Sequence, residues 1–219
     1  MARGVRLTPE PGATGTRGWL ALAALLALGA GVTTFGLERG IVDATALDWQ
    51  PGPLRQAPWR AITAAWVHYS HLHLLANLAG AALVGALGSI ARVPTASVVA
   101  WLLAWPLTQL GLLLRPDLAH YGGLSGVLHA GVAVVAVQLV LDATGARRAI
   151  GLAIGAGLAL KVGLEAPWGP ALRHPPQWDI ATAPFAHASG LAAGLACALA
   201  ARAVARTRAR TPRGDGAVP

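Results

Sequence analysis

The sequence predicts an all-α integral membrane protein with six transmembrane helices and both termini in the cytoplasm. Hydrophobic residues make up 55% of the chain and charged residues only 12%, which is well below the roughly 25% charged residues of ordinary soluble domains. Apolar runs of about 20 residues, the length that crosses a bilayer, alternate with charged or Pro-rich connections. Arginines concentrate in every second connection, and this asymmetry predicts the orientation.

The six expected spans follow one another with short polar connections. The first follows Arg17 and lacks a cleavage context, so we expect a retained anchor rather than a removable signal peptide. Three prolines in the connection after Glu38 exclude a continuous helix into the second span. The spans are expected at residues 19–37, 61–90, 95–114, 124–141, 149–164 and 183–203.

Arginine distribution predicts which side of the membrane each connection occupies. Both tails and the turns after spans two and four are rich in arginine, whereas the opposite loops mix acidic and basic residues. Connections rich in arginine and lysine stay on the cytoplasmic side of a membrane, so both tails are expected in the cytoplasm. We expect the membrane to be a bacterial inner membrane. We divide the chain into a basic cytoplasmic tail at 1–18, a six-span core at 19–204 and a basic, disordered tail at 205–219.

Charge and metal-ligand chemistry exclude several classes of function. The net charge of +8 is almost wholly arginine, because Lys161 is the only lysine, and its spread over tails and loops indicates a lipid bilayer rather than nucleic acid as partner. The single cysteine, Cys197, excludes an intrachain disulfide and a cysteine metal cluster. His68, His71 and His73 have no nearby carboxylate or thiol to complete a tetrahedral set. We therefore expect neither a metal nor a cofactor.

Polar side chains at one depth indicate a working site. His73, Ser125 and His187 all fall at the extracytoplasmic ends of their expected spans. Ionisable groups at membrane depth cost a few kcal/mol or more, so they usually face a bundle interior and mark a site. The alternative is an apolar bundle with a few hydrogen-bonded polar groups.

A serine with a nearby histidine meets the minimal requirement of acyl transfer, in which a base activates the hydroxyl and fixed donors hold the oxyanion. Ser125, expected to begin a helix just after Gly123, is the candidate nucleophile, and His187 is the candidate base. Asn77 and His73 lie four residues apart, on one helix face, and are candidate oxyanion donors together with Gly123. No acidic residue is close to His187 in sequence, so the prediction is a Ser-His dyad rather than a triad.

Small residues predict how the site is assembled. Gly126 lies on span four, and Gly190 and Gly194 are four residues apart on span six. Glycines remove bulk and let membrane helices approach closely. We expect these three to bring Ser125 and His187 within hydrogen-bonding distance.

Taken together and in order, these segments resemble the motifs of the rhomboid intramembrane serine proteases. Each alone is a weak signal, since a Gly-x-Ser-Gly in a chain with 27 glycines says little. The resemblance extends over most of the six-span core. The matching segments are Trp59-Arg60, His73 with Asn77, Gly123 to Gly126, and Ala186-His187 with Gly190 and Gly194.

The resemblance implies a serine endopeptidase that cleaves a transmembrane protein substrate, with Ser125 as nucleophile and His187 as general base. Where the family commonly has a tyrosine that packs on the catalytic histidine, this chain has His129. Stacking on His187, tuning of its basicity and direct catalysis remain open for His129. The family's fifth span is associated with substrate access, and here it carries Lys161 and Glu165, which either pair there or lie at the membrane surface with extended side chains.

The string Gly-Leu-Ser-Gly-Val-Leu-His and the expected lack of an extra domain are similar to the rhombosortase branch. That branch is associated with substrates that bear a C-terminal sorting signal made of a glycine-rich motif, an apolar helix and a basic end. The second hypothesis is a catalytically inactive rhomboid-like protein that binds transmembrane clients. The presence of Ser125, His187 and both candidate oxyanion residues favours the protease.

Overall fold

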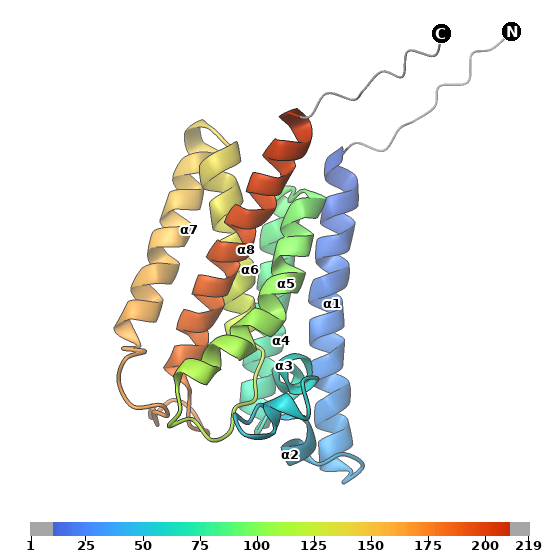
Figure 1. The fold of residues 1–219 in the computed structure, drawn as a ribbon, viewed down its shortest axis with the longest axis vertical. Helices are drawn as coiled ribbons and strands as arrows, with labels where there is room; N and C mark the ends of the chain where they lie inside the picture. The colour runs from blue at the N-terminus through green and yellow to red at the C-terminus, as the bar shows by residue number, and fades with distance from the viewer. Residues whose placement is uncertain (1–10, 211–219) are drawn as a thin grey trace, which may run out of the picture.

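Six long helices run side by side along one axis in the computed structural model, which describes residues 11–210 and the side chains of residues 15–207. The N-terminal end of α1 and the C-terminal end of α8 lie at the same end of the bundle (Figure 1). The long helices are α1 (Pro11–Glu38), α4 (His71–Ala91), α5 (Thr95–Gly111), α6 (Ser125–Asp142), α7 (Gly145–Leu164) and α8 (Pro184–Arg210).

Short helices fill the long connection between α1 and α4 at the opposite end of the bundle (Figure 1). They pack around buried residues of that loop, among them Trp49 and Leu54. The short elements are α2 (Ala44–Leu47), α3 (Arg60–Thr63) and the 3-10 helices η1 (Pro53–Arg55) and η2 (Ala64–Trp66), and a further 3-10 turn, η3 (Leu112–Leu114), continues α5.

Five helices of the described residues are long and apolar enough to cross a membrane: α1, α4, α5 with η3, α6 and α8. The expected fifth span, α7, forms a helix of 20 residues but is not among them. Arg147, Arg148 and Lys161 make it too polar to qualify by composition. An all-helical bundle is therefore confirmed, whereas a sixth membrane span remains a prediction.

The second expected span, 61–90, is wrong at its start. The chain forms α3 and η2 there, then an extended segment, and α4 begins only at His71. The hydroxyl of Ser70 accepts a hydrogen bond from the backbone N–H of His73 at 3.1 Å, the usual cap of a helix N-terminus. Ala64, Ala65 and Val67 are buried, so an apolar run that predicted a membrane helix is instead the packed end of a loop.

The first and last helices extend into the expected tails. Helix α1 begins at Pro11 rather than near residue 19, and α8 continues to Arg210. Residues 205–210 are thus helical, which corrects the prediction of disorder for that part of the C-terminal tail. The remainder of both tails, 1–10 and 211–219, lies outside the described residues.

Helix α6 is the centre of the bundle and packs against α4, α5, α7 and α8. In its span 56% of residues are buried, against 44% or less in the other four candidate spans. Small residues allow its close approach to α8. A β-carbon at Gly190 would collide with the carbonyl oxygen of Gly126, and one at Gly194 would collide with the carbonyl oxygen of Ala130. The polar residues at the start of α6 are therefore held next to the start of α8.

Candidate active site

Ser125 is the first residue of α6 and follows a tightly held loop. The N–H of Gly123 donates to the carbonyl of Ala64 at 2.9 Å. Gly123 has φ +141°, and a β-carbon there would lie 2.9 Å from the ring of His73. Only glycine fits this backbone conformation and this contact, so the loop brings the start of α6 against the His73 side chain on α4.

Ser125 and His187 form a direct hydrogen bond. Ser125 Oγ lies 2.8 Å from His187 Nε2, and the two side chains come from the first turns of α6 and α8. The side chain of His187 is 15% exposed. This contact follows from the glycine-lined approach of the two helices and has the geometry of a nucleophile and its base.

His187 also contacts a carboxylate. Its Nδ1 lies 2.6 Å from Glu165 Oε2, and the other oxygen, Oε1, accepts a hydrogen bond from Lys161 Nζ at 2.6 Å. The prediction of a Ser-His dyad considered only residues near His187 in sequence, and the structure adds a carboxylate contact from the end of another helix. Glu165 follows the last residue of α7, at the same end of the bundle as the start of α8.

The carboxylate of Glu165 is ionised at neutral pH. Burial by itself raises its pKa, but the hydrogen bonds and charges of His187 and Lys161 outweigh burial and lower the pKa to about 2. An ionised carboxylate has no proton to donate. Nδ1 of His187 must therefore be the donor in this contact.

His129 packs against one face of the His187 ring. The two imidazoles are stacked, with ring centroids 4.2 Å apart and 10° between their planes. His129 Nδ1 lies 2.7 Å from the backbone carbonyl oxygen of Ser125, not from its hydroxyl. The geometry thus favours stacking over the direct role as a base that the sequence left open.

The candidate oxyanion residues face the same space from α4. His73 and Asn77 are both buried, and Asn77 Nδ2 donates to the carbonyl oxygen of His73 at 3.1 Å. Nδ1 of His73 has no hydrogen-bond partner among the described residues. Both side chains line one cavity with Ser125 and His187.

That cavity has a volume of about 980 Å³ and is lined by both polar and apolar side chains. The loop between α7 and α8 covers one side of it with Arg173, His174 and Trp178. The apolar part lies between α4, α6 and α7 and is lined by Gly80, Leu83, Val84, Leu128, Val132 and Leu158.

A family model, the rhomboid domain, matches residues 55–203 of the sequence. The chain belongs to the rhomboid family. Rhomboids are intramembrane serine proteases that act on transmembrane substrates. The match includes α4 to α7 and most of α8, and therefore all the residues described above. No curated protein matches the sequence significantly.

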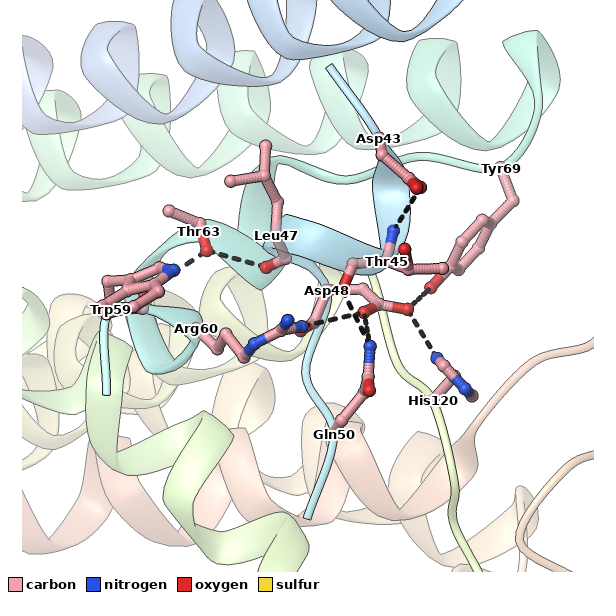
Figure 2. A network of polar contacts seen from close by, with 10 residues as sticks. All are labelled: Asp43, Thr45, Leu47, Asp48, Gln50, Trp59, Arg60, Thr63, Tyr69 and His120. Carbon is pink, nitrogen blue, oxygen red and sulfur yellow. Dashed lines mark hydrogen bonds and ion pairs between the residues drawn. The ribbon is translucent and has the colours of Figure 1, made fainter. Parts of the chain in front are cut away.

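Outside that site, the first loop of this rhomboid is organised around Asp48, whose side chain is 2% exposed. Figure 2 shows Asp48 between side chains from three segments. Asp48 Oδ1 is 3.3 Å from Arg60 Nη1, Oδ2 is 2.8 Å from His120 Nδ1, and the Tyr69 hydroxyl donates to Oδ2 at 3.1 Å. Burial, followed by the charge of Asp48, raises the pKa of Tyr69, which keeps this hydroxyl protonated as a donor.

The Asp48 network supports the loop that leads to Ser125. Next to Asp48, the backbone of Trp49 pairs with Tyr121 through hydrogen bonds of 2.8 and 3.0 Å. The Tyr121 hydroxyl then donates to the carbonyl of Gly123 at 3.2 Å. The loop between α1 and α4 therefore contacts the segment immediately before α6 at His120, Tyr121 and Gly123.

The sequence predicted Ser125, His187, His73, Asn77 and His129 as site residues, and the structure places all five around one cavity. The predicted glycines Gly126, Gly190 and Gly194 lie along the contact between α6 and α8. Sequence reasoning missed the contact of Glu165 with His187 and the role of Asp48. A usable signal existed for Glu165, because the end of the fifth segment and the start of the sixth must lie at one side of the bundle. For Asp48, 12 residues before Arg60 and 72 before His120, no local pattern indicated the contact.

Proposed function

We propose that this rhomboid is an active serine endopeptidase that cleaves membrane-anchored proteins in or beside their transmembrane segment. The observation that carries the proposal is the 2.8 Å contact between Ser125 Oγ and His187 Nε2 in a cavity shared with both candidate oxyanion residues. An inactive client-binding protein has no need of this contact.

In the proposed reaction, Ser125 Oγ attacks the carbonyl carbon of the scissile peptide bond and its proton moves to His187 Nε2. The carbonyl oxygen becomes an oxyanion, which collapses as the C–N bond breaks and Nε2 gives its proton to the leaving amine. Water then attacks the acyl ester on Ser125 and gives a proton to Nε2. Collapse of the second intermediate returns that proton to Oγ and releases the new carboxyl terminus.

Three groups are suited to hold the oxyanion. The backbone N–H of Ser125 lies in the first turn of α6, where helix N–H groups lack partners within the helix. The Asn77 amide retains a second N–H besides the one that it donates to His73, and the His73 ring lines the same cavity. Donors fixed before the reaction stabilise the developing charge most effectively.

The proposed substrate presents a glycine-rich segment next to an apolar helix and a basic end, as the likeness to the rhombosortase branch implies. Glycine weakens a helix by about 1 kcal/mol relative to alanine, so such a segment unwinds readily into an extended strand. The cavity supports this choice, because one part of its lining is apolar and includes Gly80. In the orientation that we propose from the positive-inside rule, the cavity opens at the extracytoplasmic side.

Covalent labelling with a fluorophosphonate probe tests the proposal. We expect the purified wild type to be labelled and Ser125→Ala and His187→Ala to be unlabelled. Labelling that survives Ser125→Ala would remove the nucleophile assignment. An unlabelled wild type that still co-purifies with transmembrane proteins would favour the client-binding alternative.

A second assay tests the substrate class. Two membrane reporters would carry the same apolar helix and basic end, one with a glycine-rich segment before the helix and one with leucines there. We expect cleavage of the glycine reporter only, and none by Ser125→Ala. Equal cleavage of both reporters would leave the protease in place but reject the glycine-rich signal.

A further inference from the structure

The feature that the reaction above does not use is the contact of Glu165 with His187. Glu165 approaches the imidazole on Nδ1, the nitrogen that faces away from Ser125, at 2.6 Å. It comes from the end of α7, whereas His187 and Ser125 belong to α8 and α6. A third helix therefore contributes to the geometry of the site.

We propose that Glu165 is a positioning residue that holds His187 in the tautomer and ring orientation needed to accept the Ser125 proton, and that offsets the charge of the imidazolium formed. The proposal rests on the proposed function, since it assigns Glu165 a part in the same reaction.

Counting protons supports it. A neutral imidazole carries one N–H, on either Nδ1 or Nε2. Because the Glu165 carboxylate can only accept, that proton lies on Nδ1, and Nε2 is left with its lone pair toward Ser125 Oγ. The hydroxyl must then donate in the 2.8 Å contact, which is the direction in which the proton moves during attack. Without the carboxylate, either tautomer is available.

The carboxylate is itself held in place from two directions. Lys161, one helical turn before Glu165 on α7, donates from its Nζ to Oε1 of the carboxylate. Arg173 Nη1 donates to the backbone carbonyl of Glu165 at 2.8 Å. Both carboxylate oxygens are thus occupied, and the backbone that carries them is tied to the following loop. A preorganised acceptor of this kind fixes its partner without a cost of rearrangement during the reaction.

Other titratable groups surround His187, and none of them supplies this contact. Lys161 on α7 is a cation, and His129 on α6 stacks on the ring face. His73 on α4 influences His187 only through space. Among these neighbours, Glu165 is the group whose negative charge faces the imidazolium of His187.

The isosteric variant Glu165→Gln tests the proposal. It keeps the size of the side chain but removes the negative charge and offers an N–H that can meet Nδ1. We expect the rate of fluorophosphonate labelling, and kcat for the glycine reporter, to fall by roughly 10²- to 10⁴-fold, the range that general acid–base catalysis contributes, with KM changed little. The acid limb of the rate profile should move to lower pH, because the imidazolium loses its counter-charge.

Arg147→Gln is the matched control. Arg147 also ties α7 to a neighbour, since its Nη2 donates to the carbonyl of Ala91 at 2.8 Å, but it does so at the other end of the helix. We expect this variant to label and cleave at the wild-type rate with an unchanged pH profile. An equal loss in both variants would mean that Glu165 only anchors α7 and would overturn the proposal.

Two further outcomes separate a failure of this proposal from a failure of the proposed protease function. An active wild type with a Glu165→Gln variant of equal rate and pH profile would reject the positioning role and leave the protease assignment intact. For a wild type that does not label, proton NMR of the solubilised protein reads the same contact without activity. A strongly deshielded Nδ1 proton that disappears in both His187→Ala and Glu165→Gln supports the contact, and its absence from the wild type overturns it.

Discussion

Ser125 Oγ lies 2.8 Å from His187 Nε2, although 62 residues separate them in the chain. The contact exists because α6 and α8 approach through glycines, which leave no side chain between the two backbones at Gly126 and Gly190. The proposed chemistry therefore depends on packing inside the bundle as much as on the reacting groups.

The glycine contact gives the first prediction. A methyl group at Gly190→Ala would meet the carbonyl oxygen of Gly126, so the helices must separate. We expect a loss of about 1–3 kcal/mol in stability and a loss of labelling at Ser125. Thermal unfolding in detergent and fluorophosphonate labelling check both effects.

Gly157→Ala on α7 is the control for that variant, because a β-carbon at Gly157 would meet no other atom within 4 Å. It should label normally and unfold at or slightly above the wild-type temperature, since alanine favours helix. Similar behaviour of the two variants would contradict the role given to the α6–α8 approach.

His129 gives the second prediction. The variant His129→Tyr keeps an aromatic ring available for packing against His187, whereas His129→Ala removes the stacked ring. We expect cleavage of the glycine reporter to be largely retained in the first variant and reduced several-fold in the second. Complete loss in both variants would instead indicate that His129 takes part directly as a base.

Asp48 gives the third prediction. Replacing a buried charge leaves its partner unpaired, which typically costs about 3–5 kcal/mol, and Asp48→Asn would leave Arg60 in that position. We expect a large drop in the temperature of unfolding, with part of it recovered in the double variant Asp48→Asn, Arg60→Met. The exposed Asp43 serves as control, and Asp43→Asn should have a smaller effect. Equal effects at both positions would argue against the network.

The pH dependence of stability gives the fourth prediction. The pKa of Glu165 is lowered from an ordinary value of 4.5 to about 2 in the folded protein, so its ionised contacts stabilise the fold fully above about pH 4.5. That contribution is lost as the pH falls toward 2. The difference in unfolding temperature between wild type and Glu165→Gln should shrink as the pH falls from about 4.5 toward 2. A difference that persists unchanged at pH 2 would contradict this.

Lys161 gives the fifth prediction. Lys161→Met frees one oxygen of Glu165 but leaves the contact with His187. We expect a decrease in kcat smaller than that of Glu165→Gln, because the acceptor stays charged but is less firmly oriented. A rate below that of Glu165→Gln would show that Lys161 itself contributes to the site. Steady-state cleavage of the glycine reporter distinguishes these cases.

The sequence by itself determined the helical membrane bundle and most of the residues that meet at the site. Apolar run length and helix-start signals are local properties, so spans such as α5 with η3, and α6, were predicted within a residue or two of their bounds. The motifs around His73, Ser125 and His187 could be read for the same reason, since each lies within one short segment and its chemistry follows from residue type.

Only the tertiary structure decided how the site is completed. The break before α4 was hidden because an apolar run does not distinguish a membrane helix from a buried loop. The contacts of Glu165 with His187 and of Asp48 with His120 join residues 22 and 72 positions apart. Such contacts depend on which helix ends and loops lie next to one another in the folded protein, and the hydrophobic pattern along the chain does not determine that arrangement.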